Sequence, residues 1–159
     1  AALNASLLPL YGPEARPAVQ VRHRLERALY AGDMAGVEAS LRALFAAIPH
    51  DWHRNNPLAR YEGYYASVFY SHLAALGLDA RVEDATNKGR IDLALRLDDR
   101  VVLFEFKVVE QVPDGSALVQ LQARGYAEKY RAPGVTVTQI GIEFSREARN
   151  IVGFEVAEG

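Results

Sequence analysis

Apolar residues recur at helical spacing over three stretches in the first half of the chain. Leucine, valine and alanine repeat every three or four positions over residues 17–31 and 33–47, with a Gly-Asp pair between the two stretches. Because glycine often ends a helix and aspartate often starts one, this pattern predicts a helical hairpin. A longer apolar stripe over residues 57–76 stops at Gly77 and predicts a third helix.

The second half of the chain carries shorter runs in which apolar and polar residues partly alternate, as they do in strands. We predict five strands and one further helix, namely strands over 80–84, 90–97, 100–108, 135–144 and 151–156 and a helix over 117–130. After residue 50 the order is therefore helix, three strands, helix, two strands. This order predicts an α/β domain with a mixed central sheet flanked by helices, preceded by the helical hairpin.

The second and third predicted strands form a hairpin whose register follows from its turn. Asp98-Asp99 supplies two loop residues, so Asp92 is expected directly opposite Glu105, and Arg90 opposite Lys107. The residues that alternate with these are all apolar and occupy the other face: Ile91, Leu93, Leu95, Val102, Phe104 and Phe106. One face of the hairpin is therefore core, and the other carries two carboxylates and a lysine.

Two carboxylates directly across a strand pair have Cβ atoms about 5 Å apart and destabilise the sheet through their repulsion. A hard divalent cation offsets this repulsion, since Mg²⁺ is commonly held by one or two carboxylates together with water and substrate phosphate. Lys107 lies two residues after Glu105, on the same face, where an ammonium group can orient water or stabilise a charged phosphoryl group. The spacing thus predicts a metal-dependent phosphodiesterase site.

The alternative is a solvated strand face on which Lys107 forms an ordinary ion pair. Apolar Ala94, Val101 and Leu103 on the same face indicate that this face is covered, which favours a site. Nearby basic residues either form a local rim that contacts a phosphate backbone or are ordinary surface charges: Lys88, Arg90, Arg124, Lys129 and Arg131.

Composition narrows the class of protein further. The 159 residues include 18 lysines and arginines against 20 aspartates and glutamates, a net charge of -2, so a nucleic-acid partner requires a local basic patch. The chain has no cysteine, which excludes disulfides, thiolate metal sites and cysteine nucleophiles. Its apolar runs are too short to span a bilayer, and we expect a cytoplasmic protein without a membrane partner.

Residues 57–145 resemble a PD-(D/E)xK nuclease-like domain, and most of the chain takes part in a closer resemblance. The segments YEGYYASVFYSHLAALGLDARVEDATNKGRIDLAL, FEFK and ALVQLQARGYAEKY, with the N-terminal hairpin, are similar to the group found C-terminal to an AAA-ATPase-like domain in prokaryotic proteins. The resemblance implies a restriction-endonuclease-like core. It also implies a nuclease that hydrolyses DNA or RNA with Mg²⁺ or Mn²⁺.

The resemblance assigns roles to the charged residues of the predicted site. Asp92 and Glu105 match the metal-binding carboxylates, and Lys107 matches the catalytic lysine. Glu62 matches an acidic residue on the first core helix and is expected either to bind metal or to pair with an arginine. Ile91 stands where the family name has proline, at a position that varies widely.

Two residues of the predicted helix over 117–130 match a Q-x5-Y pattern of the same family. The resemblance makes Gln120 a candidate catalytic residue that orients the substrate or Lys107, whereas a helical glutamine is most often only solvated. Tyr126 fits the pattern as well, but we expect Tyr126 and Tyr130 to be core aromatics rather than substrate contacts, and Lys129 to lie on the surface.

The expected organisation is a linker and helical hairpin over residues 1–50 and the nuclease-like domain over residues 51–159. The expected partners are nucleic acid, with DNA ahead of RNA, and an AAA-ATPase-like domain on the N-terminal side in the full-length protein. A homodimer formed through residues 1–47 is a further expectation. The alternative function is a module that binds nucleic acid or protein without cleavage, as part of a larger ATPase-containing protein.

Overall fold

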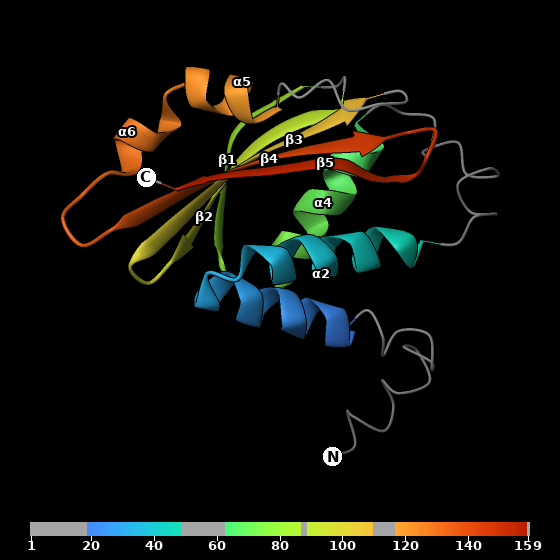
Figure 1. Ribbon diagram of the computed structural model, residues 1–159, viewed down its shortest axis with the longest axis horizontal. Helices are drawn as coiled ribbons and strands as arrows, with labels where there is room; N and C mark the ends of the chain where they lie inside the picture. The colour runs from blue at the N-terminus through green and yellow to red at the C-terminus, as the bar shows by residue number, and fades with distance from the viewer. Residues whose placement is uncertain (1–18, 49–62, 87–88, 110–116, 159) are drawn as a thin grey trace, which may run out of the picture. The chain divides into compact units, whose positions relative to one another are not determined.

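The computed structural model describes residues 19–48, 63–86, 89–109 and 117–158 (Figure 1). The chain divides into two compact units, Ala1–Ala47 and Ile48–Gly159. In the first unit, a helix over residues 19–31 is followed by α2 (Met34–Ala46). Asp33 starts α2, because its Oδ1 accepts a hydrogen bond from the backbone N–H of Gly36 at 3.0 Å. The two helices therefore form where the apolar periodicity predicts them.

The second unit is a five-stranded mixed sheet with helices on both faces. Its elements are α4 (Tyr64–Ala74), β1 (Asp79–Thr86), β2 (Arg90–Leu97), β3 (Arg100–Val109), α5 (Ala117–Ala123), α6 (Tyr126–Tyr130), β4 (Thr136–Ser145) and β5 (Asn150–Glu158). The strands lie in the order β1-β2-β3-β4-β5, and only the central β3–β4 pair is parallel. The predicted α/β fold with a restriction-endonuclease-like order of elements is confirmed.

One face of the sheet packs on α4 through aromatic rings. The ring of Phe69 stacks on that of Phe106 at 4.7 Å between centroids, and it meets Phe104 edge-on at 5.5 Å. Tyr65, one turn earlier on α4, lies 4.4 Å from Phe144 of β4. Since Phe104 and Phe106 alternate with Glu105 along β3, this aromatic core turns Glu105 to the opposite face.

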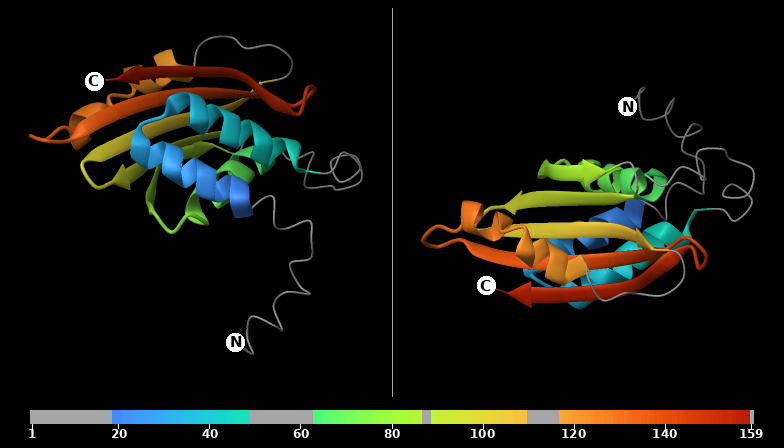
Figure 2. Two further views of the ribbon diagram at one scale, coloured as in Figure 1. Left: turned by 60° about the horizontal axis from the view of Figure 1, so that its bottom comes forward. Right: turned by 90° about the horizontal axis from the view of Figure 1, so that it is seen from above.

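The opposite face is covered by α5 and α6, which lie over β3 and β4 (Figure 2). The buried residues of this layer come from both helices and three strands: Ala94, Val101, Leu103, Leu121, Ala127, Tyr130 and Val137. Gly141 of β4 allows the close approach of α5, because a Cβ at this position would lie 2.2 Å from the backbone N of Leu118. The helical layer therefore covers the sheet right beside Glu105, the register partner of Gly141.

The predicted register of the β2–β3 hairpin is confirmed along its whole length. Asp92 pairs with Glu105 and Arg90 with Lys107, on either side of the Asp98-Asp99 turn. On the other side of β2, the pairing with β1 shifts by one residue between Val82 and Asp84.

The helix predicted over 117–130 is not continuous. It ends as α5 at Ala123, and α6 begins at Tyr126 after Gly125, which adopts a left-handed φ of 74°. The prediction was wrong at this point because a single glycine is compatible with an apolar helical stripe, and only the packing on the sheet decides whether the helix continues. Within the helix predicted over 57–76, α4 is observed, and residues 57–62 lie outside the described part of the chain.

In the part of the chain that the structure describes, no helix is both long enough and apolar enough to cross a membrane.

Candidate functional site

The two carboxylates predicted to face each other are brought together in the interior of the sheet. Asp92 and Glu105 are register partners on β2 and β3, and each is 0% exposed. Both strands lie inside the sheet, and α5 and α6 cover the face onto which the two side chains project. The pair is therefore withdrawn from bulk water rather than placed on a solvated strand face.

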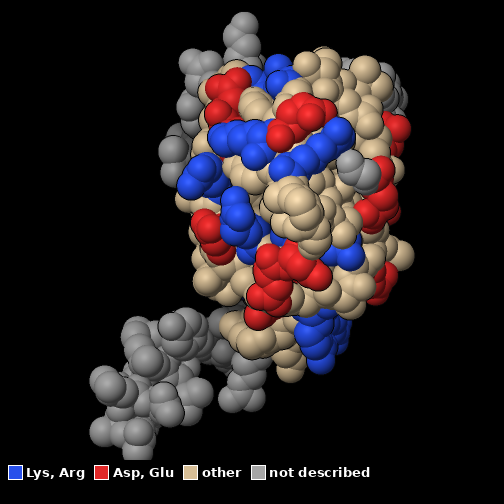
Figure 3. Space-filling view, turned by 90° about the vertical axis from the view of Figure 1, so that its left-hand side faces the viewer, with Lys and Arg blue, Asp and Glu red and all other residues tan. Residues whose placement is uncertain are grey.

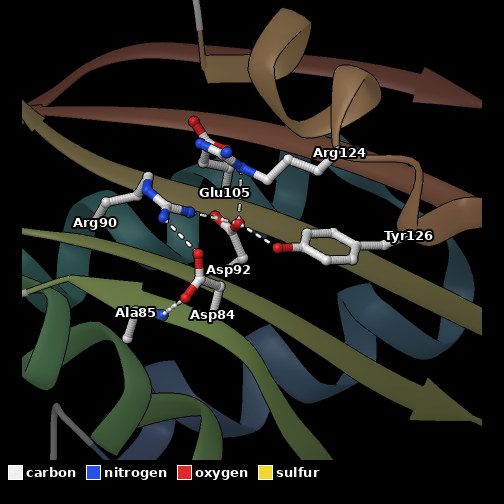
Figure 4. Close-up of polar contacts among 7 residues, drawn as sticks. All are labelled: Asp84, Ala85, Arg90, Asp92, Glu105, Arg124 and Tyr126. Atoms are coloured by element: carbon white, nitrogen blue, oxygen red, sulfur yellow. Dashed lines mark hydrogen bonds and ion pairs between the residues drawn. The ribbon is translucent and has the colours of Figure 1, made fainter.

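The Asp92 carboxylate is held through one of its two oxygens (Figure 4). Oδ2 lies 2.5 Å from Nη1 of Arg90 and 2.9 Å from Nε of Arg124, and it accepts a hydrogen bond from the hydroxyl of Tyr126 at 2.9 Å. Two charged donors and one neutral donor thus converge on a single oxygen atom, and this fixes the orientation of the carboxylate.

The Glu105 carboxylate is likewise held through one oxygen. Oε1 accepts a hydrogen bond from Nε of Arg124 at 3.0 Å. The pKa of Glu105 is raised to about 6, because burial and, to a smaller extent, the negative charge of Asp92 outweigh the lowering effect of the Arg124 hydrogen bond. Keeping the Glu105 carboxylate ionised at neutral pH therefore costs free energy.

The second oxygen of each carboxylate has no hydrogen-bond partner among the residues that the structure describes. Asp92 Oδ1 and Glu105 Oε2 are buried, and neither accepts a hydrogen bond from any residue that the structure describes. Unpaired buried anionic oxygens are costly, and oxygen ligands are the ones that hard divalent cations prefer. The chemistry of the two carboxylates therefore fits a Mg²⁺ or Mn²⁺ ion, which Asp92 and Glu105 would hold.

A third protein ligand is not found in the described ranges, where no group of three histidines, aspartates or glutamates is placed to hold a metal ion. Glu62, the third carboxylate expected at the site, lies outside the described residues.

The site also contains a carboxylate of β1, and the sequence did not predict this residue. The shift in pairing places Asp84 opposite Asp92, and Asp84 Oδ2 lies 2.7 Å from Nη2 of Arg90. The hydrogen bond from Arg90 lowers the pKa of Asp84, and Arg90 thus bridges two acidic strand residues. The neighbouring Glu83 accepts hydrogen bonds from Lys129 and from the Tyr130 hydroxyl. A one-residue shift of this kind leaves no signal in the alternation of apolar and polar residues.

The structure places Lys107 and Gln120 as follows. Lys107 is half-buried on β3, beside Arg90 on one side and Glu143 on the other, on the face that carries Glu105. Gln120 is half-buried on α5, and its carbonyl accepts a hydrogen bond from the backbone N–H of Arg124 at 3.1 Å. Within the described residues no side-chain hydrogen bond links Gln120 to the two carboxylates, so the catalytic roles of both residues stay predictions.

Tyr126 is a core aromatic, as predicted, and it also contacts the site. It packs against the buried layer under α6, as expected of a core aromatic, but its hydroxyl donates to Asp92. Burial raises its pKa to about 12, and the hydrogen bond to Asp92 raises it as well, so the hydroxyl stays protonated as a donor. The Q-x5-Y pattern was the available signal for this contact.

The predicted basic rim is largely paired with acidic residues. Arg90 and Arg124 contact the site carboxylates directly, which composition and periodicity do not reveal. Lys129 is half-exposed, in line with the predicted surface position, and pairs with Glu83, while Arg131 pairs with Glu128. Lys88 lies outside the described residues.

Comparison with known proteins identifies the family to which this chain belongs. Residues 60–154 match the family model of the PD-(D/E)XK nuclease superfamily. The chain belongs to the PD-(D/E)XK nuclease superfamily. It is also 56% identical over 156 residues to a protein of Azotobacter chroococcum mcd 1 named "Uncharacterized protein in vnfD 5'region". That match covers 98% of this chain, which spans 30% of the length of that relative.

The superfamily assignment agrees with the arrangement of the site. PD-(D/E)XK nucleases generally use divalent metals, and the match spans both carboxylates, Lys107 and the two helices that cover them. The resemblance drawn from the motifs is confirmed at the level of the superfamily.

Proposed function

We propose that this chain is a nuclease domain that hydrolyses phosphodiester bonds of DNA or RNA with Mg²⁺ or Mn²⁺ at Asp92 and Glu105. The observation that supports this proposal best is the pair of fully buried carboxylates, each with one oxygen that no described residue contacts through a hydrogen bond. A structural ion pair would use both oxygens of each carboxylate or leave the spare oxygen in water. Oδ1 and Oε2 are instead both buried, on side chains that project from the same face of the sheet.

Different residues would hold the cation and orient its ligands. Asp92 and Glu105 would hold the cation, and Arg90 and Tyr126 fix the orientation of the Asp92 carboxylate. When bound, a divalent cation polarises the phosphodiester group and the attacking water.

The two remaining candidates act on the same face of the sheet. Lys107 stabilises the negative charge that develops on phosphorus oxygens or orients the water, because its ammonium group follows Glu105 by two residues on one face. Gln120, on the helix above, orients the substrate or Lys107, and Glu62 adds a third carboxylate to the metal.

The test is cleavage of end-labelled single-stranded DNA, duplex DNA and RNA, each with Mg²⁺, Mn²⁺ or EDTA. Wild-type protein is compared with Asp92→Asn and Lys107→Ala. The matched controls are Asp79→Asn, an exposed carboxylate on β1, and Lys129→Ala, an exposed lysine on α6. We expect metal-dependent cleavage that both site variants lose and both controls keep. Equal cleavage by Asp92→Asn and wild type would overturn the proposal.

A second candidate is a module that binds nucleic acid or protein without cleavage. It is favoured over an autonomous nuclease, because the net charge of -2 and the interspersed acidic and basic side chains on the face drawn in Figure 3 give weak affinity for a polyanionic substrate. Salt-dependent oligonucleotide binding that persists in EDTA and in Asp92→Asn, without cleavage, would support this candidate.

We propose two protein partners on separate grounds. The family resemblance supports an AAA-ATPase-like domain on the N-terminal side in the full-length protein, and the matched relative is long enough to hold further domains. A homodimer through residues 1–47 is tested by light scattering of the chain with and without these residues.

A further inference from the structure

Arg124 occupies the position between the two carboxylates. Its Nε lies 2.9 Å from Asp92 Oδ2 and 3.0 Å from Glu105 Oε1, so one nitrogen bridges both acidic residues. The residue belongs to the two-residue break between α5 and α6, directly before Gly125 with its left-handed φ of 74°. A positive charge of the protein therefore stands where the negative charges of the pair are most concentrated.

The two arginines of the site differ in how firmly they are tied. Arg90 is anchored at both ends of its guanidinium, to Asp92 and to Asp84, and its side chain is 16% exposed. Arg124 is held through its Nε by the pair itself, and its side chain is 30% exposed. Its closest contacts run through Nε, so the terminal nitrogens of the fork are not needed to hold the carboxylates.

A divalent cation bound to Asp92 and Glu105 changes the electrostatics of this arginine. It neutralises the charge that holds Arg124 and repels the guanidinium. A guanidinium released next to the metal is well suited to a phosphate group, which it binds through two parallel hydrogen bonds.

We propose that Arg124 exchanges partners. In the metal-free protein it bridges Asp92 and Glu105, and when a divalent cation takes over that role it contacts the phosphate of the nucleic-acid substrate. This inference rests on the proposed metal-dependent function of the same pair. Arg124 therefore weakens metal binding by competing for the carboxylates, and it also contacts the substrate.

The first consequence is tested by calorimetric titration with Ca²⁺ of wild type, Arg124→Met, Arg124→Lys and Arg131→Met. Arg131, an exposed arginine at the end of α6, is the matched control. We expect Arg124→Met to bind Ca²⁺ about tenfold more tightly than wild type, since a competing unit charge is removed. Arg124→Lys and Arg131→Met should bind as wild type does. Equal or weaker binding by Arg124→Met, with thermal unfolding showing a folded protein, would overturn the proposal.

The second consequence separates an exchange of partners from a fixed electrostatic effect. Binding of a labelled oligonucleotide is followed by fluorescence anisotropy, in Ca²⁺ and in EDTA, with a gel to show that the oligonucleotide stays intact. We expect Arg124→Met to lose about tenfold in affinity in Ca²⁺ and less than twofold in EDTA, where the arginine is held by the carboxylates. An equal loss in both conditions would contradict the exchange.

Metal binding by wild type distinguishes a failure of the partner exchange from a failure of the proposed metal site. If wild type binds Ca²⁺ and Asp92→Asn does not, while Arg124→Met shows no gain, the exchange is wrong and the metal site stands. If wild type binds neither Ca²⁺ nor Mn²⁺, the proposed function and the exchange are both overturned.

Discussion

Asp92 and Glu105 lie directly opposite each other on β2 and β3, and each keeps one buried oxygen without a partner among the described residues. Their other oxygens share the guanidinium of Arg124. The fold thus balances the repulsion and desolvation of two carboxylates against the ion pairs that hold them. This balance makes stability, as well as activity, a readout of the site.

Glu105 makes the stability of the metal-free protein depend on pH. Its pKa is raised by burial from about 4.5 to about 6 in the folded state, so the folded protein binds more protons than the unfolded chain between these values. Its contribution to stability is therefore fully present below pH 4.5 and lost as the pH rises through 6.

We expect the free energy of unfolding of wild type, relative to Glu105→Gln, to fall by about 2 kcal/mol between pH 4.5 and pH 7.5. Urea unfolding in EDTA at several pH values measures this difference. Glu128→Gln, which changes an exposed carboxylate on α6, is the control. If the difference in free energy of unfolding between wild type and Glu105→Gln does not change with pH, the raised pKa of Glu105 is contradicted.

Asp92 is expected to stabilise the metal-free fold in spite of its charged neighbour. Three donors converge on its Oδ2, from Arg90, Arg124 and Tyr126, and their loss outweighs the relief of repulsion with Glu105. We predict that Asp92→Ala lowers the free energy of unfolding by about 2 kcal/mol at pH 7.5 in EDTA. Asp79→Ala, an exposed control, should leave it unchanged. A gain in stability for Asp92→Ala would show that repulsion dominates.

Tyr126 is predicted to strengthen metal binding, whereas Tyr130, also in α6, is not. Tyr126→Phe and Tyr130→Phe each remove one hydroxyl that donates to a carboxylate, to Asp92 and to Glu83 respectively. Each should cost about 1 kcal/mol in urea unfolding. Only Tyr126→Phe should weaken Mn²⁺ binding, by about tenfold, since its partner is a proposed metal ligand. The same loss in both variants would argue for a general structural effect.

Gly141 is predicted to set the distance between α5 and the sheet. A Cβ there would lie 2.2 Å from Leu118 N and 2.6 Å from Leu118 Cα, and these are backbone atoms that cannot turn away. We expect Gly141→Ala to cost about 3 kcal/mol in thermal or urea unfolding. Gly134→Ala, which has open space but a left-handed φ of 79°, should cost about 1 kcal/mol. A reversed order of the two costs would show that α5 moves freely.

The centre of the site could be predicted because it depends on local geometry. A two-residue turn fixes the pairing of β2 with β3, and the alternation of apolar residues decides which face each side chain occupies. The opposition of Asp92 and Glu105 follows from these two facts, and so does the position of Lys107 on the same face.

The partners of the carboxylates could not be predicted in the same way. Arg124 reaches Glu105 from 19 residues further along the chain, and only because α5 ends early and packs closely over Gly141. Asp84 faces Asp92 through a one-residue shift in pairing that no periodicity records. Contacts of this kind depend on how whole elements pack, which the local pattern does not contain.

The most direct test of the account is a Mn²⁺ titration followed by electron paramagnetic resonance, in which free Mn²⁺ is counted against bound. Wild type, Asp92→Asn, Glu105→Gln and the control Asp79→Asn are compared at pH 7.5. We predict that wild type and Asp79→Asn bind Mn²⁺ alike, and that each site variant binds at least about tenfold more weakly. Binding by Asp92→Asn and Glu105→Gln as tight as that of wild type would contradict a metal site formed by the two carboxylates.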